Sequence, residues 1–298
     1  MRRMKRTILI ILACLAIGAG AAVIALVAGK QETSGGISLI TGNAREHDMD
    51  VIYINAGKAD SMLLKIDGQA FLIDTGLKKS VKMIKKVLGK YGVSSLEAVF
   101  LSHRHSDHVG GLEKIAKSYP IKKLYSPAIS NCSEEAENSI DRKADELNIS
   151  LKKLSAGDRV PLVEDVTMEV LGPLEENKED DNDNSLVLRI FVNKRVFLFT
   201  GDMQFSEEKT LLDAGVDVSA DIYKVGNHGN PDATSEKFAK AVSPEIAIIT
   251  TDTEKDQDSA NKRVISSFKK AKVLLTQDYD LGIRITVDGN GKIAAGQA

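Results

Sequence analysis

Cysteine is scarce in this sequence, with only Cys14 and Cys132 among 298 residues. Cys14 lies in an apolar run and Cys132 stands alone outside every motif, which excludes a disulfide framework. Long repeats are absent, and the one low-complexity tract is EENKEDDNDN at residues 175–184. Fibrous and intrinsically disordered chains are therefore excluded. With 43% hydrophobic residues, a chain of this length can bury a substantial core, as one large domain or two small ones.

Clustered basic charge is missing beyond the N-terminus. The whole chain has a formal net charge of -2, and residues 1–30 carry basic side chains but no acid, so the remainder is more acidic still. A protein that grips nucleic acid through its phosphates needs clustered lysine and arginine. The lysine-rich segment 77–91, LKKSVKMIKKVLGKY, has apolar residues at helical spacing, which predicts a helix with a solvated lysine face. No stable binding of nucleic acid is expected.

The N-terminus predicts a membrane anchor. Residues 1–6 are basic, and residues 7–29 contain no charge. At about 1.5 Å per helical residue such a run crosses a hydrocarbon core of about 30 Å. Basic residues stay cytoplasmic, so the polar linker 30–48 and the domain at 49–298 are expected outside the cell, at the membrane. Secretion after cleavage of a signal peptide is the alternative, although the apolar core of such peptides is shorter, about 7–15 residues.

Residues 49–298 alternate between strand-like and helix-like segments. The strand-like segments are VIYINAG, SMLLKI, AFLIDTG, LEAVFLS, VTMEVLG, SLVLRIFV, RVFLFTGD, ADIYKVG and EIAIITT. Helical segments lie near residues 133–147, 205–214, 234–242 and 261–270. This order predicts an α/β or α+β fold of the kind found in enzymes.

The segment SHRHSDHVGG, at residues 102–111, concentrates metal-binding side chains, because three of the five histidines fall within six residues. His103 and His105 are two residues apart, so in an extended loop they point to the same side and can share one ion. Asp107 and His108 follow and, once the chain turns, can face a second ion. Imidazole nitrogen with carboxylate oxygen is a ligand set for zinc or a similar divalent ion.

HRHSDH matches the HxHxDH signature of the metallo-β-lactamase superfamily, and the resemblance covers nearly the whole region after the linker. INAGKADSMLL, LIDTG, NDNSLVLRI, FLFTGDM, YKVGNHGN and SPEIAIITT follow the order of motifs in the extracytoplasmic hydrolase domain of ComEC-type DNA-uptake proteins and its stand-alone relatives. The resemblance implies a four-layer αββα sandwich with a metal site at one edge of the paired sheets.

The resemblance also implies a site for two divalent ions, zinc or alternatively manganese. His103 and His105 match ligands of the first ion, and Asp107 and His108 match ligands of the second. Asp202 of TGDM matches the bridging ligand, and the last histidine ligand is matched by the GNHG histidine, His228. Asp107 is also expected to hold the attacking water. Asp60 and Asp74 match acids that orient ligands by hydrogen bonds.

Some positions depart from the superfamily pattern. Asn227 stands where many relatives have a histidine, and an amide can donate a hydrogen bond to a phosphate oxygen but cannot act as an acid. We therefore place Asn227 among the catalytic candidates. Another superfamily histidine is replaced by the NDNS segment, where Asn184 is placed with the ligand-orienting residues. A site with fewer imidazoles favours oxygen-preferring manganese.

Two functions follow as hypotheses. The first is a membrane-anchored extracytoplasmic hydrolase in which two metal ions activate water to cleave phosphodiester bonds, in nucleic acid or in the cell envelope. The second is a catalytically weak binding or regulatory domain with the same fold. DNA uptake itself is disfavoured because a single predicted span builds no channel, and β-lactam hydrolysis because the closest motifs belong to another branch.

Overall fold

A computed structural model describes residues 45–130 and 139–298. The predicted basic segment, the predicted anchor at 7–29 and nearly all of the linker lie outside these residues, as does Cys132. Within the described ranges no helix has the length and apolarity needed to cross a bilayer. The predicted boundary at residue 49 coincides with the start of the first strand, but His47 before it is buried and its backbone N–H donates to Asn193 Oδ1 at 2.9 Å.

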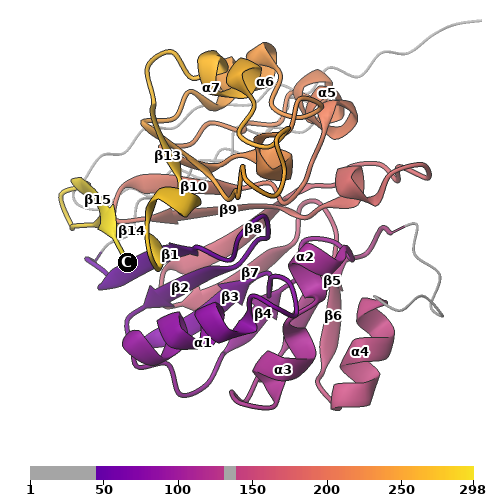
Figure 1. The fold of residues 1–298 in the computed structure, drawn as a ribbon, viewed down its shortest axis with the longest axis vertical. Coiled ribbons are helices and arrows are strands. Elements are labelled where there is room, and N and C mark those ends of the chain that lie inside the picture. The colour runs from indigo at the N-terminus through magenta and orange to yellow at the C-terminus, as the bar shows by residue number, and fades with distance from the viewer. Residues whose placement is uncertain (1–44, 131–138) are drawn as a thin grey trace, which may run out of the picture. The chain divides into compact units, whose positions relative to one another are not determined.

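The described residues form two β-sheets that pack face to face (Figure 1). The first sheet has the strand order β15-β14-β1-β2-β3-β4-β5-β6 and the second β13-β12-β11-β10-β9-β8-β7. The strands of the first sheet are β1 Met49–Ile54, β2 Met62–Ile66, β3 Gln69–Ile73, β4 Ala98–Phe100, β5 Leu124–Pro127, β6 Leu151–Leu154, β14 Gly282–Val287 and β15 Ile293–Gln297. Those of the second are β7 Arg159–Val163, β8 Val166–Gly172, β9 Val187–Val192, β10 Arg195–Phe199, β11 Ile222–Lys224, β12 Ile246–Ile249 and β13 Lys272–Leu275.

The largest apolar cluster lies between the two sheets, and the residue pattern of the strands explains it. In β8, Val166, Met168 and Val170 alternate with less buried residues, so one face of this strand enters the core. In β1 nearly every residue is buried, because the outer face of the first sheet is covered by helices.

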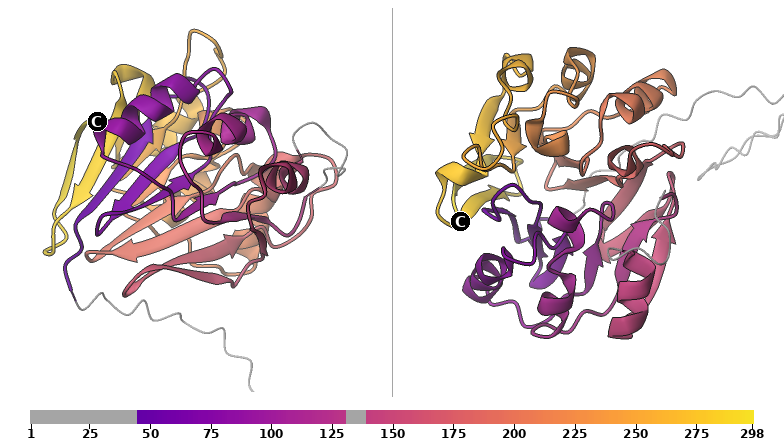
Figure 2. Two further views of the ribbon diagram at one scale, coloured as in Figure 1. Left: turned by 90° about the horizontal axis from the view of Figure 1, so that it is seen from below. Right: turned by 45° about the vertical axis from the view of Figure 1, so that its right-hand side comes forward.

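Helices cover the outer face of each sheet, as Figure 2 shows from two further directions. The first sheet carries α1 Val81–Lys90, α3 Leu112–Ala116 and α4 Ile140–Leu147; the second carries α5 Phe205–Asp213, α6 Glu236–Val242 and α7 Lys262–Ser267. The order helix, sheet, sheet, helix confirms the predicted four-layer αββα sandwich. The predicted lysine face of α1 is also confirmed, since Lys82, Lys85 and Lys86 are exposed opposite buried Ile84 and Val87.

The two C-terminal strands join the first sheet rather than the second. β14 pairs antiparallel with β1, with Val51 opposite Ile285, so the end of the domain closes against its beginning. The strand prediction did not contain β14 and β15, nor the short strands β5, β6, β7 and β13. Several of these are only partly buried and short, so their sequences carry at most a brief apolar run, such as VLL in β13.

Five strands end at one edge of the sandwich, and the residues that follow them build the site. β3 and β4 run parallel in the first sheet, and β10, β11 and β12 run parallel in the second. Parallel strands bring their carboxyl ends to the same edge. The loops after β3, β4, β10, β11 and β12 contain Asp74, His103, Asp202, His228 and Thr250, respectively.

Candidate metal centre

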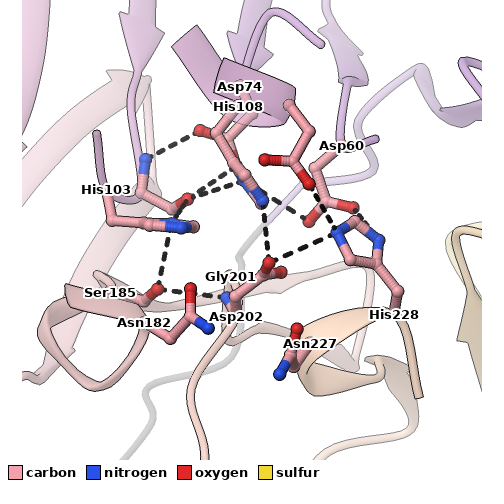
Figure 3. Close-up of polar contacts among 12 residues, drawn as sticks. Asp60, Asp74, His103, His108, Asn182, Ser185, Gly201, Asp202, Asn227 and His228 are labelled. Atoms are coloured by element: carbon pink, nitrogen blue, oxygen red, sulfur yellow. Dashed lines mark hydrogen bonds and ion pairs between the residues drawn. The ribbon is translucent and has the colours of Figure 1, made fainter. Parts of the chain in front are cut away.

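Three fully buried imidazoles converge at this edge (Figure 3). His103, His108 and His228 each have an Nε2 atom that makes no hydrogen bond to any described residue. Two of these atoms face one carboxylate oxygen, Asp202 Oδ2, at 3.1 Å from His108 and 3.2 Å from His228. His103 Nε2 has no partner among the described residues, which is rare for a buried polar atom, and the other two Nε2 atoms face carboxylates, so the group fits a bound cation.

Four of the predicted ligands form a cluster with metal-binding geometry. One ligand atom from each of Asp107, His108, Asp202 and His228 lies within 4.8 Å of the others. His228 Nε2 is also 3.3 Å from Asp107 Oδ2. Two imidazoles and two carboxylates suit zinc, and the oxygen content suits manganese as well. The residues present therefore fit a divalent ion.

The other two predicted ligands lie beside this cluster. The ring of His103 lies 4.6 Å from that of His105 and 4.1 Å from that of His108, measured between centroids. His103 Nδ1 faces the hydroxyls of Ser102 and Ser185 at 3.1 and 3.2 Å, which leaves Nε2 available for an ion. All six predicted ligands are thus brought to one edge by the fold, with His105 half-exposed at the start of the short helix α2 (Ser106–Val109).

The turn after the HxHxDH motif needs both of its glycines. Thr75 N–H donates to His108 O at 2.6 Å, so the loop after β3 lies directly against α2. A Cβ at Gly111 would be 2.1 Å from Thr75 O, and one at Gly110 would be 2.3 Å from Ser106 O. The glycines of HVGG therefore allow the backbone that follows α2 to lie in contact with the loop that contains Asp74.

Asp74 contacts His108, which agrees with the ligand-orienting role that the resemblance implies for it. Its Oδ2 lies 2.8 Å from His108 Nδ1, and both carboxylate oxygens accept from Ser102, through the backbone N–H at 2.7 Å and the hydroxyl at 2.8 Å. Asp74 adopts a φ of 58°, a left-handed conformation that costs free energy in a non-glycine residue. The strain and the carboxylate–histidine pair together point His108 Nε2 toward Asp202.

Asp60 lies behind His228 rather than only capping a turn. Its Oδ1 accepts from Thr250 Oγ1 at 2.5 Å, and the carbonyl of Thr250 is 2.8 Å from His228 Nδ1. Its Oδ2 forms an ion pair with the fully buried Lys224. Asp60 also lies within metal-binding distance of Asp74 and His108, but there the ring atom of His108 is Nδ1, which Asp74 already occupies.

The GNHG turn holds His228 in strained backbone. Asn227 and His228 have φ values of 43° and 51° inside a short 3-10 turn, Gly226–Gly229. Asn227 is buried beside the cluster, and its amide donates to Asp232 Oδ1 at 3.0 Å. An amide has two N–H groups. Its catalytic role stays a prediction.

Asn184 does not contact the predicted metal ligands directly. Asn184 lies in the 3-10 turn Asp181–Asn184, and its side-chain amide hydrogen-bonds the backbone of Asn177 and the carboxylate of Asp181. Asp181 in turn contacts Arg104, which lies between His103 and His105 in the sequence. Asn182 was not among the predicted site residues. It lies beside Ser185 in Figure 3, and its buried Oδ1 accepts no hydrogen bond from the described residues.

Burial and opposite charges shift the pKa values in the cluster. For His108 burial lowers the pKa, but the carboxylates of Asp202 and Asp74 outweigh it and hold the pKa well above its usual range. For His228 burial is again outweighed, by Asp202 and Asp107, and the pKa rises to about 9. Burial would raise the pKa of Asp202, but both histidines hold it well below its usual range. Without metal, protons occupy positions that cations would take.

Other contacts at the site had little signal in the sequence. Lys224, Ser185 and Thr250 all hydrogen-bond site residues or their backbone. Serine and threonine near strand ends are too common to single out. Lys224 had one usable signal, because it is a charged residue between the apolar residues of the strand segment IYKV.

Comparison with known proteins gives consistent relationships. Over 219 residues the chain is 28% identical to ComE operon protein 3 of Bacillus subtilis, covering 67% of this chain and 28% of that protein. It is 27% identical over 213 residues to competence protein ComA of Neisseria gonorrhoeae, covering 69% of this chain and 27% of the relative. The chain thus spans little more than a quarter of either relative's length.

A solved structure and a family profile agree with these relatives. The metallo-beta-lactamase fold protein YhfI from Bacillus subtilis aligns with a TM-score of 0.53 at 12% identity, over 84% of this chain and 100% of that one, which shows the shared fold. Residues 54–251 match the profile of the Metallo-beta-lactamase superfamily. The predicted resemblance, including that to ComEC-like competence proteins, is confirmed. The chain belongs to the metallo-β-lactamase superfamily.

Proposed function

We propose that this protein is a binuclear metal-dependent hydrolase that cleaves phosphodiester bonds in nucleic acid or in the cell envelope. One observation carries the metal-dependent part: the buried imidazoles of His108 and His228 converge with Asp202 and Asp107, and ligand atoms of all four lie within 4.8 Å of one another. His103, His105 and Asp202 would hold one ion, and Asp107, His108, His228 and the shared Asp202 the other. Bound divalent ions would supply Lewis-acid activation of a water and neutralisation of charge on the substrate oxygens.

The side chains have separate tasks in such a reaction. In the metal-free protein burial would raise the pKa of Asp107, but the positive charges of His108 and His228 hold it far below its usual range; bound cations would likewise favour the ionised carboxylate. It is one-fifth exposed, and an ionised carboxylate there can accept a hydrogen bond from an incoming water. The second N–H of the Asn227 amide, beyond the one given to Asp232, can donate to a phosphate oxygen.

The phosphodiester substrate is supported by sequence similarity. The chain is 28% and 27% identical to two competence proteins over about two thirds of its length, and no nucleophilic serine or cysteine is needed for hydrolysis by activated water. We propose further that residues 7–29 anchor the chain and place the domain outside the cell, since the run is uncharged and follows a basic segment.

An assay of phosphodiester hydrolysis tests the proposal. The full-length protein, stripped and reloaded with zinc or manganese, should hydrolyse bis(p-nitrophenyl) phosphate and contain up to two metal ions per chain by elemental analysis. His103→Ala and Asp202→Ala should lose metal and activity, while Glu176→Gln, an exposed change, should alter neither. A chain with less than one bound metal ion, or with activity that survives both alanine changes, would contradict it.

The same assay separates the alternative of a weak binding domain. If the wild-type chain binds metal fully but does not turn over the ester, and Asn227→His restores turnover, the asparagine has weakened catalysis. Placement outside the cell is tested separately, by protease digestion of intact cells: the domain should be cleaved without lysis.

A further inference from the structure

Lys224 is a charged residue with no exposed surface, at the end of β11. A lysine ammonium is costly to bury unless its hydrogens are satisfied. Here the Nζ forms an ion pair with Asp60, donates to Gly201 O at 2.8 Å and lies 3.7 Å from Asp202 Oδ1. The three donors of one ammonium thus face three acceptors around the metal cluster.

One of these contacts, from Lys224 to Gly201 O, restrains the Gly201–Asp202 peptide. The Gly201 carbonyl accepts from Lys224 and from Asn227 N–H at 3.3 Å. On the opposite side of the same peptide, Asp202 N–H donates to Ser185 Oγ at 3.0 Å. The peptide is therefore held on both sides, which fixes the backbone from which the Asp202 carboxylate reaches His108 and His228.

A second contact of Lys224, with Asp60, connects it indirectly to His228. Lys224 pairs with Asp60 Oδ2, and Asp60 Oδ1 accepts from the Thr250 hydroxyl. The Thr250 carbonyl in turn lies 2.8 Å from His228 Nδ1. One ammonium therefore links the supports of Asp202 and of His228, which come from loops after different strands.

We propose that Lys224 is a positioning residue of the metal centre, which orients Asp202 through the Gly201–Asp202 peptide and His228 through Asp60 and Thr250. The inference deepens the proposed function and rests on it for the identity of the ligands. Because the ammonium neutralises Asp60, that carboxylate supports the site from behind and the ions bind on the Nε2 side of the histidines.

Two effects of removing the lysine oppose each other, and their signs make the proposal testable. Loss of a positive charge close to Asp202 would by Coulomb attraction favour a bound cation. Loss of the restraint on the Gly201–Asp202 peptide would disfavour it, since changes to residues that support metal ligands typically weaken binding about 10- to 100-fold. Positioning predicts that the second effect prevails.

Cobalt(II) is the probe, because its absorption spectrum reports the ligands' geometry without any substrate. In the full-length protein, Lys224→Met should raise the cobalt dissociation constant about 10- to 100-fold and change the visible spectrum. The matched control is Lys65→Met, which also removes a lysine bonded to a backbone carbonyl, that of Tyr91 at 2.9 Å, away from the site. This variant should keep wild-type affinity and spectrum.

Unchanged or tighter cobalt binding by Lys224→Met, with the wild-type spectrum, would overturn the proposal and leave the lysine as a counter-ion only. If this variant does not fold, Asp60→Asn/Lys224→Met removes both charges of the pair, and the same affinity loss and spectral change are expected; a wild-type spectrum and affinity would again overturn it. A wild-type chain that binds cobalt yet hydrolyses no phosphodiester would contradict only the proposed function.

Discussion

At the scale of single residues, each buried imidazole of the centre has one nitrogen held by the protein and the other directed into the cluster. His108 Nδ1 is held by Asp74 and His228 Nδ1 by the Thr250 carbonyl. This division fixes the ring orientation before an ion arrives and leaves each Nε2 facing the cluster. Removing the Asp74 charge beside His108 and removing the proton of His228 should therefore have separate effects, the first on metal affinity and the second on stability.

Asp74→Asn should weaken metal binding without unfolding the domain. Asparagine keeps an oxygen for Ser102 but loses the charge that orients His108 Nδ1, so we expect the zinc dissociation constant to rise about 10- to 100-fold. Competition with a chromophoric chelator measures it. Unaltered affinity would show that Asp74 only terminates its strand, and the exposed change Glu176→Gln serves as the control.

The stability of the metal-free protein should depend on pH in the alkaline range. The pKa of His228 is about 9 in the folded state and about 6.5 when unfolded, so its ion pairs stabilise the fold fully below about pH 6.5. This contribution, on the order of 3 kcal/mol, is lost as pH rises through about 9. Urea denaturation between pH 6 and 10 measures it. His228→Gln should flatten the profile; an equal slope in both proteins would refute the assignment.

At the scale of elements, the centre depends on turns that follow parallel strands. The turn after β10 combines strain with crowding, because Gly201 has a φ of 50° and an added Cβ would lie 2.8 Å from the side chains of Ser102 and Ser185. Those two serines lie in loops beside strands of different sheets, Ser102 after β4 and Ser185 before β9, and both face His103. A glycine is required there by conformation and by space together.

Gly201→Ala should therefore cost more stability than an alanine at a roomy glycine of similar φ. Gly215 has a φ of 70° with nothing within 4 Å of an added Cβ, so Gly215→Ala reports the backbone cost alone, about 1–2 kcal/mol. We expect Gly201→Ala to exceed it by about 1–3 kcal/mol from overpacking. Denaturant titration with a chelator present gives both values, and equal costs would disprove the crowding.

At the scale of the whole domain, the ligands come from both sheets. His103, Asp107 and His108 follow β4 of the first sheet, whereas Asp202 and His228 follow β10 and β11 of the second. An ion held by both sets joins the two sheets at their shared edge. Binding to the folded state alone stabilises it by mass action.

Metal should accordingly raise the melting temperature of the full-length protein. At a free zinc concentration of a hundred times the dissociation constant the gain is about 2.7 kcal/mol, which corresponds to roughly 5–10 °C for a domain of this size. Calorimetry with zinc and with a chelator compares the two states. His103→Ala/His228→Ala should show no difference between them, and a wild-type melting temperature indifferent to metal would contradict a metal centre.

The mixed α and β character was predictable from local patterns, whereas the sandwich and the six ligand candidates were implied by the resemblance of the motifs to the superfamily. Buried strands show as apolar runs, and HRHSDH places His103, His105, Asp107 and His108 within six residues. The half-exposed strands and the joining of β14 to β1 were not predictable, since strand pairing depends on long-range partners and their sequences carry at most a brief apolar run.

What the sequence by itself determined is the chemistry of the ligands and the fold that carries them. Only the tertiary structure decided which nitrogen of each histidine is available, that Asp60 is neutralised by Lys224, and that the Gly201–Asp202 peptide is held from both sides. The physical reason is that orientation arises from contacts between residues up to 190 positions apart, as between Asp60 and Thr250, and no local pattern records such a contact.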